Sequence, residues 1–171
     1  MPTGVLLVAE RTITYAGTLS PTPRKILDVG PGYGKHGVLL HEYLDPTPEV
    51  HAVEMWEPYI TDFRLEGIYD RVMAGDACDM TEEMLDQYDL VVMGDVIEHM
   101  EKQRALDFLS RIKGWVIIST PLEHFHTEEG LPPTEAHISH WTKYDFVKTG
   151  RLERYEEAYG CLLARLSPLT D

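Results

Sequence analysis

The chain has 171 residues, of which 43% are hydrophobic and 26% charged, a balance typical of a folded, water-soluble protein and not of a disordered one. Its formal net charge is −14, and nine acidic residues but no Lys or Arg lie from Val72 to Glu101. A surface of this kind repels phosphate backbones, so the composition argues against a long DNA or RNA partner.

The apolar runs and the cysteines of the sequence bear on membrane association and on the compartment. No apolar run approaches the roughly 18 to 20 residues that a membrane helix needs, so we expect no membrane association. The segment Met1–Arg11 has only a short apolar stretch and no basic residue ahead of it, unlike a secretory signal. Cys78 and Cys161 are the only cysteines and offer no disulfide framework, which suits a reducing compartment. We therefore expect a cytoplasmic protein, whose oligomeric state the sequence leaves open.

Short runs rich in Val and Ile alternate with helical segments along most of the chain. The runs are almost continuously apolar, as expected of strands that are buried on both faces of a parallel sheet. In chain order they are Lys25–Val29, Val50–Glu54, Arg71–Ala74, Leu90–Met93 and Trp115–Ser119. Helices are expected between them at Lys35–Leu44, Pro58–Leu65, Thr81–Asp86 and Lys102–Ile112. This alternation predicts a doubly wound α/β sheet with right-handed crossovers.

The last part of the chain begins with a loop, residues 120–140, which is long enough to predict a mobile lid over a site. Thr142 then begins a short helix, with Asp145 three positions later as a variant of the capping box. Residues 151–166 resemble two strands joined at Tyr159 and Gly160, which predicts a hairpin. Because no repeat or linker separates a second unit, we expect a single domain over residues 1–171.

A glycine-rich loop, Gly30-Pro-Gly32-Tyr-Gly34, joins the first strand to the first expected helix. Glycines there let the backbone turn tightly and approach a ligand, while the N–H groups of the helix point at it. Gly32-x-Gly34-x-x-Gly37 also satisfies the dinucleotide fingerprint, which leaves an NAD-dependent oxidoreductase as an alternative. Asp28, inside the strand end, suits a ligand with an ammonium group better than one with a pyrophosphate. A purely structural turn is the other alternative.

From about Lys25 to Phe146 the sequence resembles the class I S-adenosylmethionine-dependent methyltransferases. The stretch ILDVGPGYG is similar to the first motif of that family, and Glu54 matches the acid that binds the ribose hydroxyls. Gly75-Asp76-Ala77 resembles the segment that contacts adenine, and Gly94-Asp95 matches the fourth motif. These pieces fall at the carboxyl ends of successive strands, where an open α/β sheet binds ligands.

The resemblance implies a Rossmann-like sheet of seven strands, in the order 3-2-1-4-5-7-6 with strand 7 antiparallel. It also implies S-adenosylmethionine as the cofactor, with no appended substrate domain. The cofactor-binding residues that it implies are Asp28, Gly30, Gly32, Gly34, Glu54, Met55, Asp76, Ala77 and Gly94.

The acceptor of the methyl group is less well defined by the sequence. No Asn/Asp-Pro-Pro-Tyr segment follows the fourth strand, as it usually does in methyltransferases acting on base amino groups. The pattern KILDVGPGYGKHG…GDVIEHM…EAHISHW also resembles a group of small bacterial and phage methyltransferases, which implies the reaction and leaves the acceptor open. We expect O-methylation of a hydroxyl on a small or saccharide- or nucleoside-like acceptor. Because the core is so short, a non-catalytic S-adenosylmethionine-binding partner subunit is an alternative.

The segment Asp95-Val-Ile-Glu98-His99, directly after the fourth strand, has two interpretations. In the first, Asp95 caps the next helix, and Glu98 and His99 are polar residues of its first turn. In the second, the segment resembles the magnesium site of small-RNA 2′-O-methyltransferases, in which acid-x-x-Glu-His supplies three ligands. Asp95 stands where that family usually has Glu.

A downstream histidine completes that magnesium site in the small-RNA enzymes, in a segment of the form His-x-x-x-Trp-Thr-Arg-x-x-Phe. Here His137 is followed by Trp141-Thr142-Lys143 and by Phe146 at the same spacing. The resemblance thus implies that Asp95, Glu98, His99 and His137 bind Mg²⁺ or another divalent cation. Glu98, His99 and His137 are also the expected catalytic residues.

The remaining histidines offer one further alternative. His124-x-His126 together with His137-x-x-His140 would make an all-imidazole zinc site, although this is not a recognised ligand spacing. We expect His36, His41 and His51 to be packed or surface residues.

Overall fold

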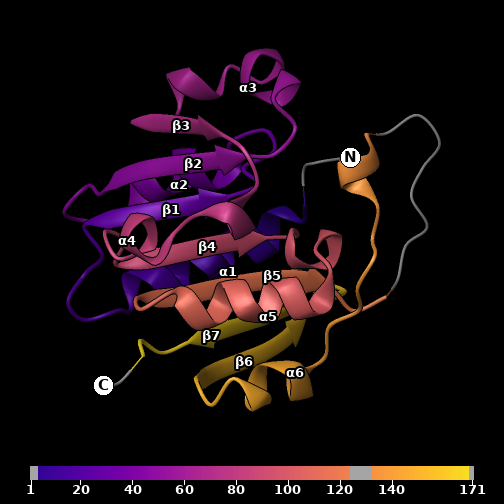
Figure 1. Cartoon of the computed structure of the whole chain (residues 1–171). Coiled ribbons are helices and arrows are strands. Elements are labelled where there is room, and N and C mark those ends of the chain that lie inside the picture. The colour runs from indigo at the N-terminus through magenta and orange to yellow at the C-terminus, as the bar shows by residue number, and fades with distance from the viewer. Residues whose placement is uncertain (1–3, 124–131, 170–171) are drawn as a thin grey trace.

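In the computed structural model, which describes residues 4–123 and 132–169, the sheet has seven strands in the order β3-β2-β1-β4-β5-β7-β6 (Figure 1). β7 pairs antiparallel with both β5 and β6, whereas the pairs among β1 to β5 are parallel. The predicted fold class and strand order are therefore confirmed. The strands are β1 (Lys25–Val29), β2 (Glu49–Glu54), β3 (Arg71–Ala74), β4 (Leu90–Gly94), β5 (Trp115–Pro121), β6 (Leu152–Ala158) and β7 (Cys161–Leu166).

The helices agree with the predicted ones except at two places. They are α1 (Leu6–Gly17), α2 (Lys35–Tyr43), α3 (Pro58–Asp62), α4 (Glu82–Leu85), α5 (Lys102–Arg111) and α6 (Lys143–Lys148). The short 3₁₀ turns among the described residues are η1 (Leu65–Gly67), η2 (Ala77–Asp79), η3 (Ile97–His99) and η4 (Pro133–Glu135). The helix predicted over Pro58–Leu65 ends early because Arg64 has a left-handed backbone, with a φ of 54°.

The other difference is α1, which the sequence analysis did not predict. Its segment Arg11–Tyr15 is rich in β-branched residues, which have weak helix propensity, and no side chain caps the helix. Burial of its apolar side stabilises it instead: Val8, Ile13 and Tyr15 belong to one core cluster with residues of α2 and of the sheet. Tertiary packing therefore decides this helix, as it does for most short helices.

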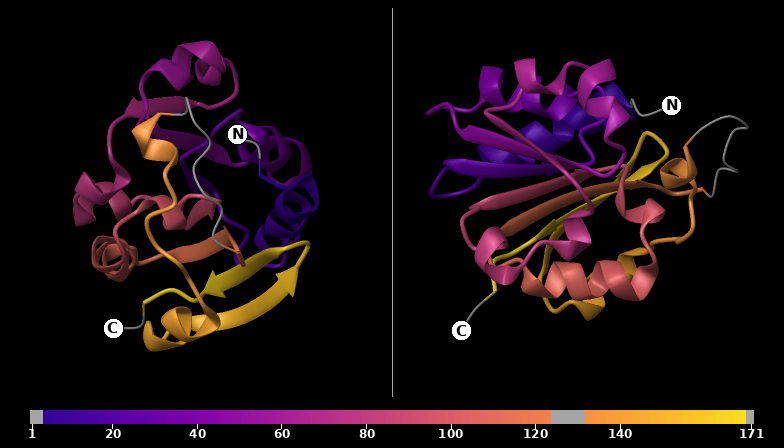
Figure 2. Two further views of the ribbon diagram at one scale, coloured as in Figure 1. Left: turned by 90° about the vertical axis from the view of Figure 1, so that its right-hand side faces the viewer. Right: turned by 45° about the horizontal axis from the view of Figure 1, so that its top comes forward.

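Two helical layers cover the sheet (Figure 2). Along β4, Leu90 and Val92 pack into the cluster that includes α1 and α2, while Val91 and Met93 pack into the cluster that includes α5. This alternation is the period of two that a strand imposes on its side chains. The carboxyl ends of β1, β2, β4 and β5 consequently lie along one edge of the sheet between the two layers.

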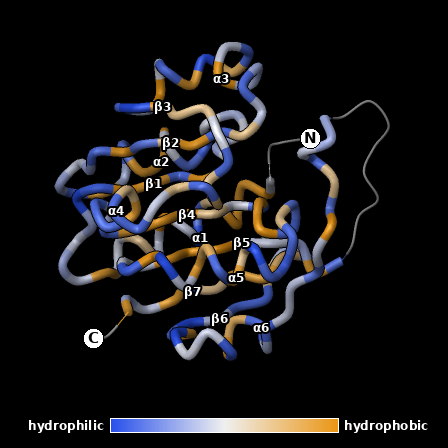
Figure 3. Tube along the Cα trace, in the orientation of Figure 1, coloured by the Kyte–Doolittle hydropathy of each residue, from blue (hydrophilic) through white to orange (hydrophobic). Residues whose placement is uncertain are grey.

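Hydropathy follows the same arrangement, with hydrophobic residues concentrated in the central strands and a largely polar edge strand β6 (Figure 3). Charged side chains on an edge strand oppose pairing with other chains. No helix in the described ranges has the length and apolar character required to cross a bilayer.

The predicted capping box of α6 is confirmed, because Thr142 and Asp145 make both of its hydrogen bonds. The predicted hairpin turn at Tyr159 and Gly160 is also confirmed.

Candidate active site

A cavity of about 940 Å³ lies at the carboxyl ends of β1, β2, β4 and β5. This is the edge at which an open α/β sheet binds its ligands, and the volume is at the upper end of the usual range for ligand sites. Most of the residues expected to bind the cofactor line it, namely Gly30, Gly32, Glu54, Met55, Asp76, Ala77 and Gly94. All the residues expected to bind a cation also line it, namely Asp95, Glu98, His99 and His137.

Two glycines let the backbone form this cavity. Gly30 has a φ of 63°, and an added Cβ there would lie 2.6 Å from Cγ2 of Val96. At Gly94, an added Cβ would lie 2.1 Å from Cε1 of His36. Larger residues at either position would push neighbouring side chains out of place, so the approach of the first loop to the end of β4 requires glycine.

Asp28 and Gly34 do not line the cavity. The Asp28 side chain is fully buried beneath the glycine loop, where its Oδ2 accepts a hydrogen bond of 2.6 Å from the Tyr69 hydroxyl. Burial raises the pKa of Asp28 to about 7, and the hydrogen bond from Tyr69 partly opposes this rise. Tyr69 in turn accepts a hydrogen bond from the Gly37 amide, so Asp28 supports the first turn of α2 from below.

Unlike Asp28, the acids Glu54 at the end of β2 and Asp76 after β3 lie at the cavity. Glu54 is largely buried at the cavity wall, and its Oε1 accepts a hydrogen bond of 2.7 Å from the Trp56 amide. Burial raises the pKa of Glu54, and the nearby carboxylate of Glu135 raises it further. Asp76 accepts a hydrogen bond of 2.8 Å from the Cys78 amide and thereby caps η2.

Asp95 does not cap the following helix, so that part of the first interpretation is wrong. It has a φ of 55°, a left-handed conformation that separates β4 from η3, and Glu101 caps α5 instead. The Asp95 Oδ1 accepts a hydrogen bond of 3.1 Å from the Ser119 hydroxyl. Burial raises the pKa of Asp95, while Ser119 and the positive charge of Lys35 oppose the rise.

Glu98, His99 and His137 come together in the cavity, with one potential ligand atom from each lying within 4.8 Å of the others. The Nδ1 of His99 is 3.1 Å from the carbonyl oxygen of Ala136, which favours a proton on Nδ1 and leaves Nε2 as the ligand atom. This Nε2 lies 4.0 Å from Oε1 of Glu98. Two ligands on opposite sides of one small divalent cation are roughly 4.2 Å apart, so small side-chain shifts would suffice to bind it.

Within this group, the Glu98 carboxylate is buried without well-formed hydrogen bonds from the described residues that would compensate its charge. Its side chain is 4% exposed, and neither carboxylate oxygen makes a hydrogen bond of good geometry with a described residue. Burial and then the negative charge of Asp95 raise its pKa to about 8. A buried carboxylate without a partner is costly, and a bound cation would compensate it. The three side chains therefore fit a divalent cation.

Backbone hydrogen bonds bring His137 to this place. The amides of Ile138 and Ser139 both donate to the Glu98 carbonyl, at 2.9 and 3.0 Å. Trp141, which is 1% exposed, donates from Nε1 to the Ile97 carbonyl at 3.1 Å and stacks on Phe146. The segment after η4 is thus held against η3, the turn that carries Glu98 and His99.

The alternative zinc site gains no such support. His124 and His126 lie outside the described residues, as does the middle of the predicted lid. His140 is exposed, and its Nε2 lies 3.3 Å from the Leu122 carbonyl.

Asp95, although it lines the cavity, is not among the three residues whose ligand atoms cluster.

Several residues of the cavity wall escaped the sequence analysis. They are Gly4, Val5, Val8 and Ala9 at the start of the chain, Lys35 and His36 on α2, and Arg104 on α5. Lys35 and His36 directly follow the glycine loop, which is a signal that could have identified them. The others reach the cavity only through tertiary packing, and no local pattern marks them.

The strand order and the position of the cavity define a Rossmann-like α/β protein with a ligand site at its switch point. Residues 6–163 match a family described as a methyltransferase domain, and the chain belongs to this family. Comparison with curated proteins finds no match.

Three solved structures illustrate the likeness of the fold. Magnesium protoporphyrin IX methyltransferase from Synechocystis PCC 6803, solved with bound SAM, is 15% identical with a TM-score of 0.67, over 95% of this chain and 79% of that chain. An O-methyltransferase family protein from Burkholderia thailandensis is 11% identical with a TM-score of 0.59, over 95% of this chain and 57% of that one. A protein from Rhodobacter sphaeroides described as a putative Zn-dependent alcohol dehydrogenase is 10% identical with a TM-score of 0.68, over 94% and 89%. At these identities the likeness establishes the fold alone.

Proposed function

We propose that this protein transfers the methyl group of S-adenosylmethionine to a hydroxyl of a small or saccharide- or nucleoside-like acceptor. The observation that carries this proposal is that one cavity holds both the expected cofactor residues and the group of Glu98, His99 and His137. Membership of the methyltransferase family and the SAM-bound Synechocystis structure support the cofactor. The Burkholderia protein, an O-methyltransferase family member of the same fold, supports a hydroxyl acceptor.

In this proposal the residues at the strand ends bind the cofactor. Glu54 accepts hydrogen bonds from the ribose hydroxyls, Asp76 accepts one from the adenine amine, and the loop at Gly30 and Gly32 lies close to the amino-acid end. The bound cofactor supplies a methyl group on a sulfonium, which is transferred by in-line displacement. Because little other chemistry is required, the main task of the protein is to align the two reactants.

The group of Glu98, His99 and His137 acts on the acceptor. A divalent cation bound there would lower the pKa of the acceptor hydroxyl. Glu98 supplies the negative charge, and the two imidazoles supply neutral nitrogen ligands, a mixed set that suits several divalent cations. The carbonyl of Ala136 fixes the orientation of the His99 ring, so that its Nε2 faces the Glu98 carboxylate.

The charges of the wall support an acceptor without phosphate. Among the described lining residues the Lys and Arg side chains are Lys35, whose Nζ donates to the Gly4 carbonyl, and Arg104, which pairs with carboxylates. Pro133, Thr134, Glu135, His137 and Ile138 line the cavity, which supports the proposal that residues 120–140 are a lid. On η4, Glu135 faces Tyr59 of α3, and burial followed by that carboxylate raises the pKa of Tyr59 to about 12.

Titration calorimetry tests the cofactor. We expect S-adenosylmethionine and S-adenosylhomocysteine to bind with micromolar affinity, about −8 kcal/mol, and NAD not to bind. Glu54→Ala should weaken both adenosyl compounds about 10- to 100-fold, because two ribose hydroxyls lose a charged acceptor. Glu57→Ala, an exposed acid on the same loop, is the matched control and should change little. Binding of NAD alone would establish the oxidoreductase alternative.

The binding of a cation is expected to depend on pH. The Glu98 carboxyl must lose its proton to become a ligand, and its pKa is raised to about 8. Each pH unit below that value should therefore weaken the binding of Mn²⁺ about tenfold, with release of one proton. Calorimetry in buffers of different ionisation enthalpy measures both quantities. An affinity that is constant between about pH 6.5 and pH 8 would exclude Glu98 as a ligand.

A further inference from the structure

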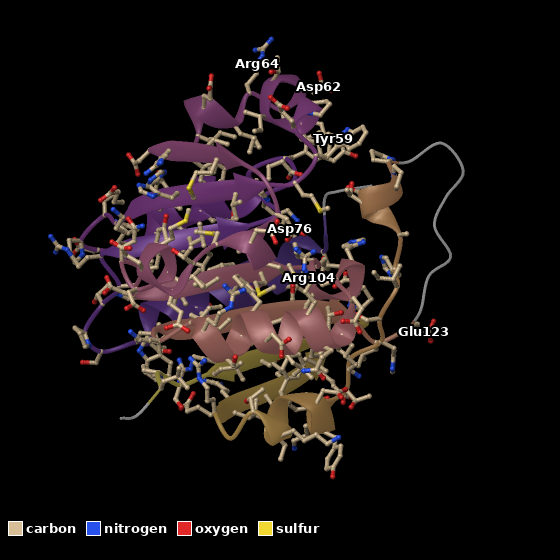
Figure 4. The ribbon with its side chains drawn as sticks, viewed as in Figure 1. Tyr59, Asp62, Arg64, Asp76, Arg104 and Glu123 are labelled. Atoms are coloured by element: carbon tan, nitrogen blue, oxygen red, sulfur yellow. The ribbon has the colours of Figure 1, made fainter. Side chains whose placement is uncertain are left out.

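Arg104 of α5 reaches across the cavity wall to the loop that follows β3. Its Nη1 donates to Oδ2 of Asp76 at 2.6 Å, and its Nη2 donates to Oδ1 of Asp79 at the same distance. Figure 4 shows Arg104 and Asp76 close together, on elements that are far apart in the sequence. Both side chains line the cavity.

The contact with Arg104 gives the second oxygen of the Asp76 carboxylate a hydrogen-bond donor. Its Oδ1 already accepts a hydrogen bond from the Cys78 amide at 2.8 Å, and the guanidinium now holds Oδ2. With one donor on each oxygen, the plane of the carboxylate has a single orientation. Each carboxylate oxygen can accept about two hydrogen bonds, so each retains a site for a ligand.

We propose that Arg104 is a positioning residue for nucleobase selectivity, which holds the Asp76 carboxylate so that it accepts a hydrogen bond from the exocyclic amine of adenine. The inference rests on the proposed cofactor and extends it to a residue that does not itself contact the amine. In hypoxanthine a carbonyl oxygen replaces this amine, so a fixed carboxylate meets an acceptor in place of a donor. A carboxylate released from Arg104 would rotate away from that carbonyl and would also bind the amine less well.

The test compares S-adenosylhomocysteine with S-inosylhomocysteine by titration calorimetry on the full chain. The unaltered protein should prefer the adenosyl compound by about 100-fold, since the inosyl compound leaves the carboxylate facing an oxygen. Arg104→Ala should lower this ratio about tenfold, by weakening the adenosyl compound and sparing the inosyl one. Arg104→Lys should restore part of the ratio, because one ammonium can still hold Oδ2 of Asp76.

Asp79→Asn is the matched control. It loosens the other arm of the guanidinium, at an aspartate whose side chain is 76% exposed, and leaves the pair of Arg104 with Asp76. We expect its ratio to stay within about twofold of the unaltered protein, as for other exposed ion pairs. Thermal melting without ligand checks that each variant is folded.

Two results would overturn the inference, since both leave the ratio unchanged: affinities that Arg104→Ala does not alter, or an equal loss of affinity for both compounds. The second would mean that the guanidinium acts on the cofactor or on the fold in general. If the unaltered protein binds neither compound, the cofactor assignment fails, and the role of Arg104 fails with it.

Discussion

Replacing Glu98 with Gln is expected to abolish the binding of Mn²⁺ while leaving the binding of S-adenosylhomocysteine within about threefold of the unaltered protein. The amide keeps the shape of the side chain but removes the charge that a divalent cation requires. Because loss of a residue that only supports a ligand costs about 10- to 100-fold in affinity, loss of the ligand itself should exceed 100-fold. His99→Ala and His137→Ala should behave in the same way, since both contribute to the cluster. Calorimetry with each ligand separately measures the two effects.

Asp95→Asn is the informative comparison for this experiment. Asp95 accepts a hydrogen bond from Ser119 and lies outside the cluster of three, so we expect its variant to weaken Mn²⁺ less than tenfold, through loss of a nearby charge. A loss as large as that of Glu98→Gln would make Asp95 the fourth ligand that the resemblance implied.

Chelation should also stop transfer of labelled methyl groups to hydroxyl acceptors. Full activity in chelator would exclude the metal and leave His99 either as a lone general base or as a packed residue without a chemical role.

Trp141→Ala is expected to be strongly destabilising, lowering the free energy of unfolding by about 3 to 5 kcal/mol. The indole is 1% exposed, stacks on Phe146 and donates from Nε1 to the Ile97 carbonyl and the Ser139 hydroxyl. Its removal creates a cavity and releases the segment that holds His137 against η3. We therefore expect Mn²⁺ binding to be lost together with stability. Urea unfolding and Mn²⁺ calorimetry measure the two results.

Two further variants separate the causes. Trp141→Phe keeps most of the buried ring and loses the N–H group, so it should cost less than Trp141→Ala. Tyr144→Ala, on the exposed side of α6, should change stability by less than about 0.5 kcal/mol. If Trp141→Ala unfolds at nearly the same urea concentration as Tyr144→Ala, Trp141 does not hold the segment of His137 against η3 as proposed.

Much of the fold was readable because its signals are local or repeat along the chain. The strand β4 is a continuous apolar run and β1 is nearly so, since both of their faces are buried, and this pattern stands out in sequence. The pair Thr142 and Asp145 predicted the start of α6, because a capping box spans only four residues. The resemblance to a family supplied the strand order and the acids at the strand ends, of which Glu54 and Asp76 lie at the cavity as expected.

Only the tertiary structure decided the orientation of several of these side chains. Asp28 follows the family pattern, but the hydrogen bond from Tyr69 holds it beneath the loop and away from the cavity. Asp95 lies two residues before η3, and because this turn comes between β4 and α5, Glu101 and not Asp95 caps α5. Which way a side chain points depends on the φ of its residue and on partners from other elements, and neither is encoded in the spacing of motifs.

The sequence by itself therefore determined the sheet, the ligand-binding edge and the residue types that gather there. Which of them contact one another was settled by contacts between distant segments: the amides of Ile138 and Ser139 on the Glu98 carbonyl, and Arg104 on Asp76. Local patterns reflect hydrophobic burial, which repeats with the period of each helix or strand. A single hydrogen bond between distant segments leaves no such period, because its geometry exists only once the core has packed.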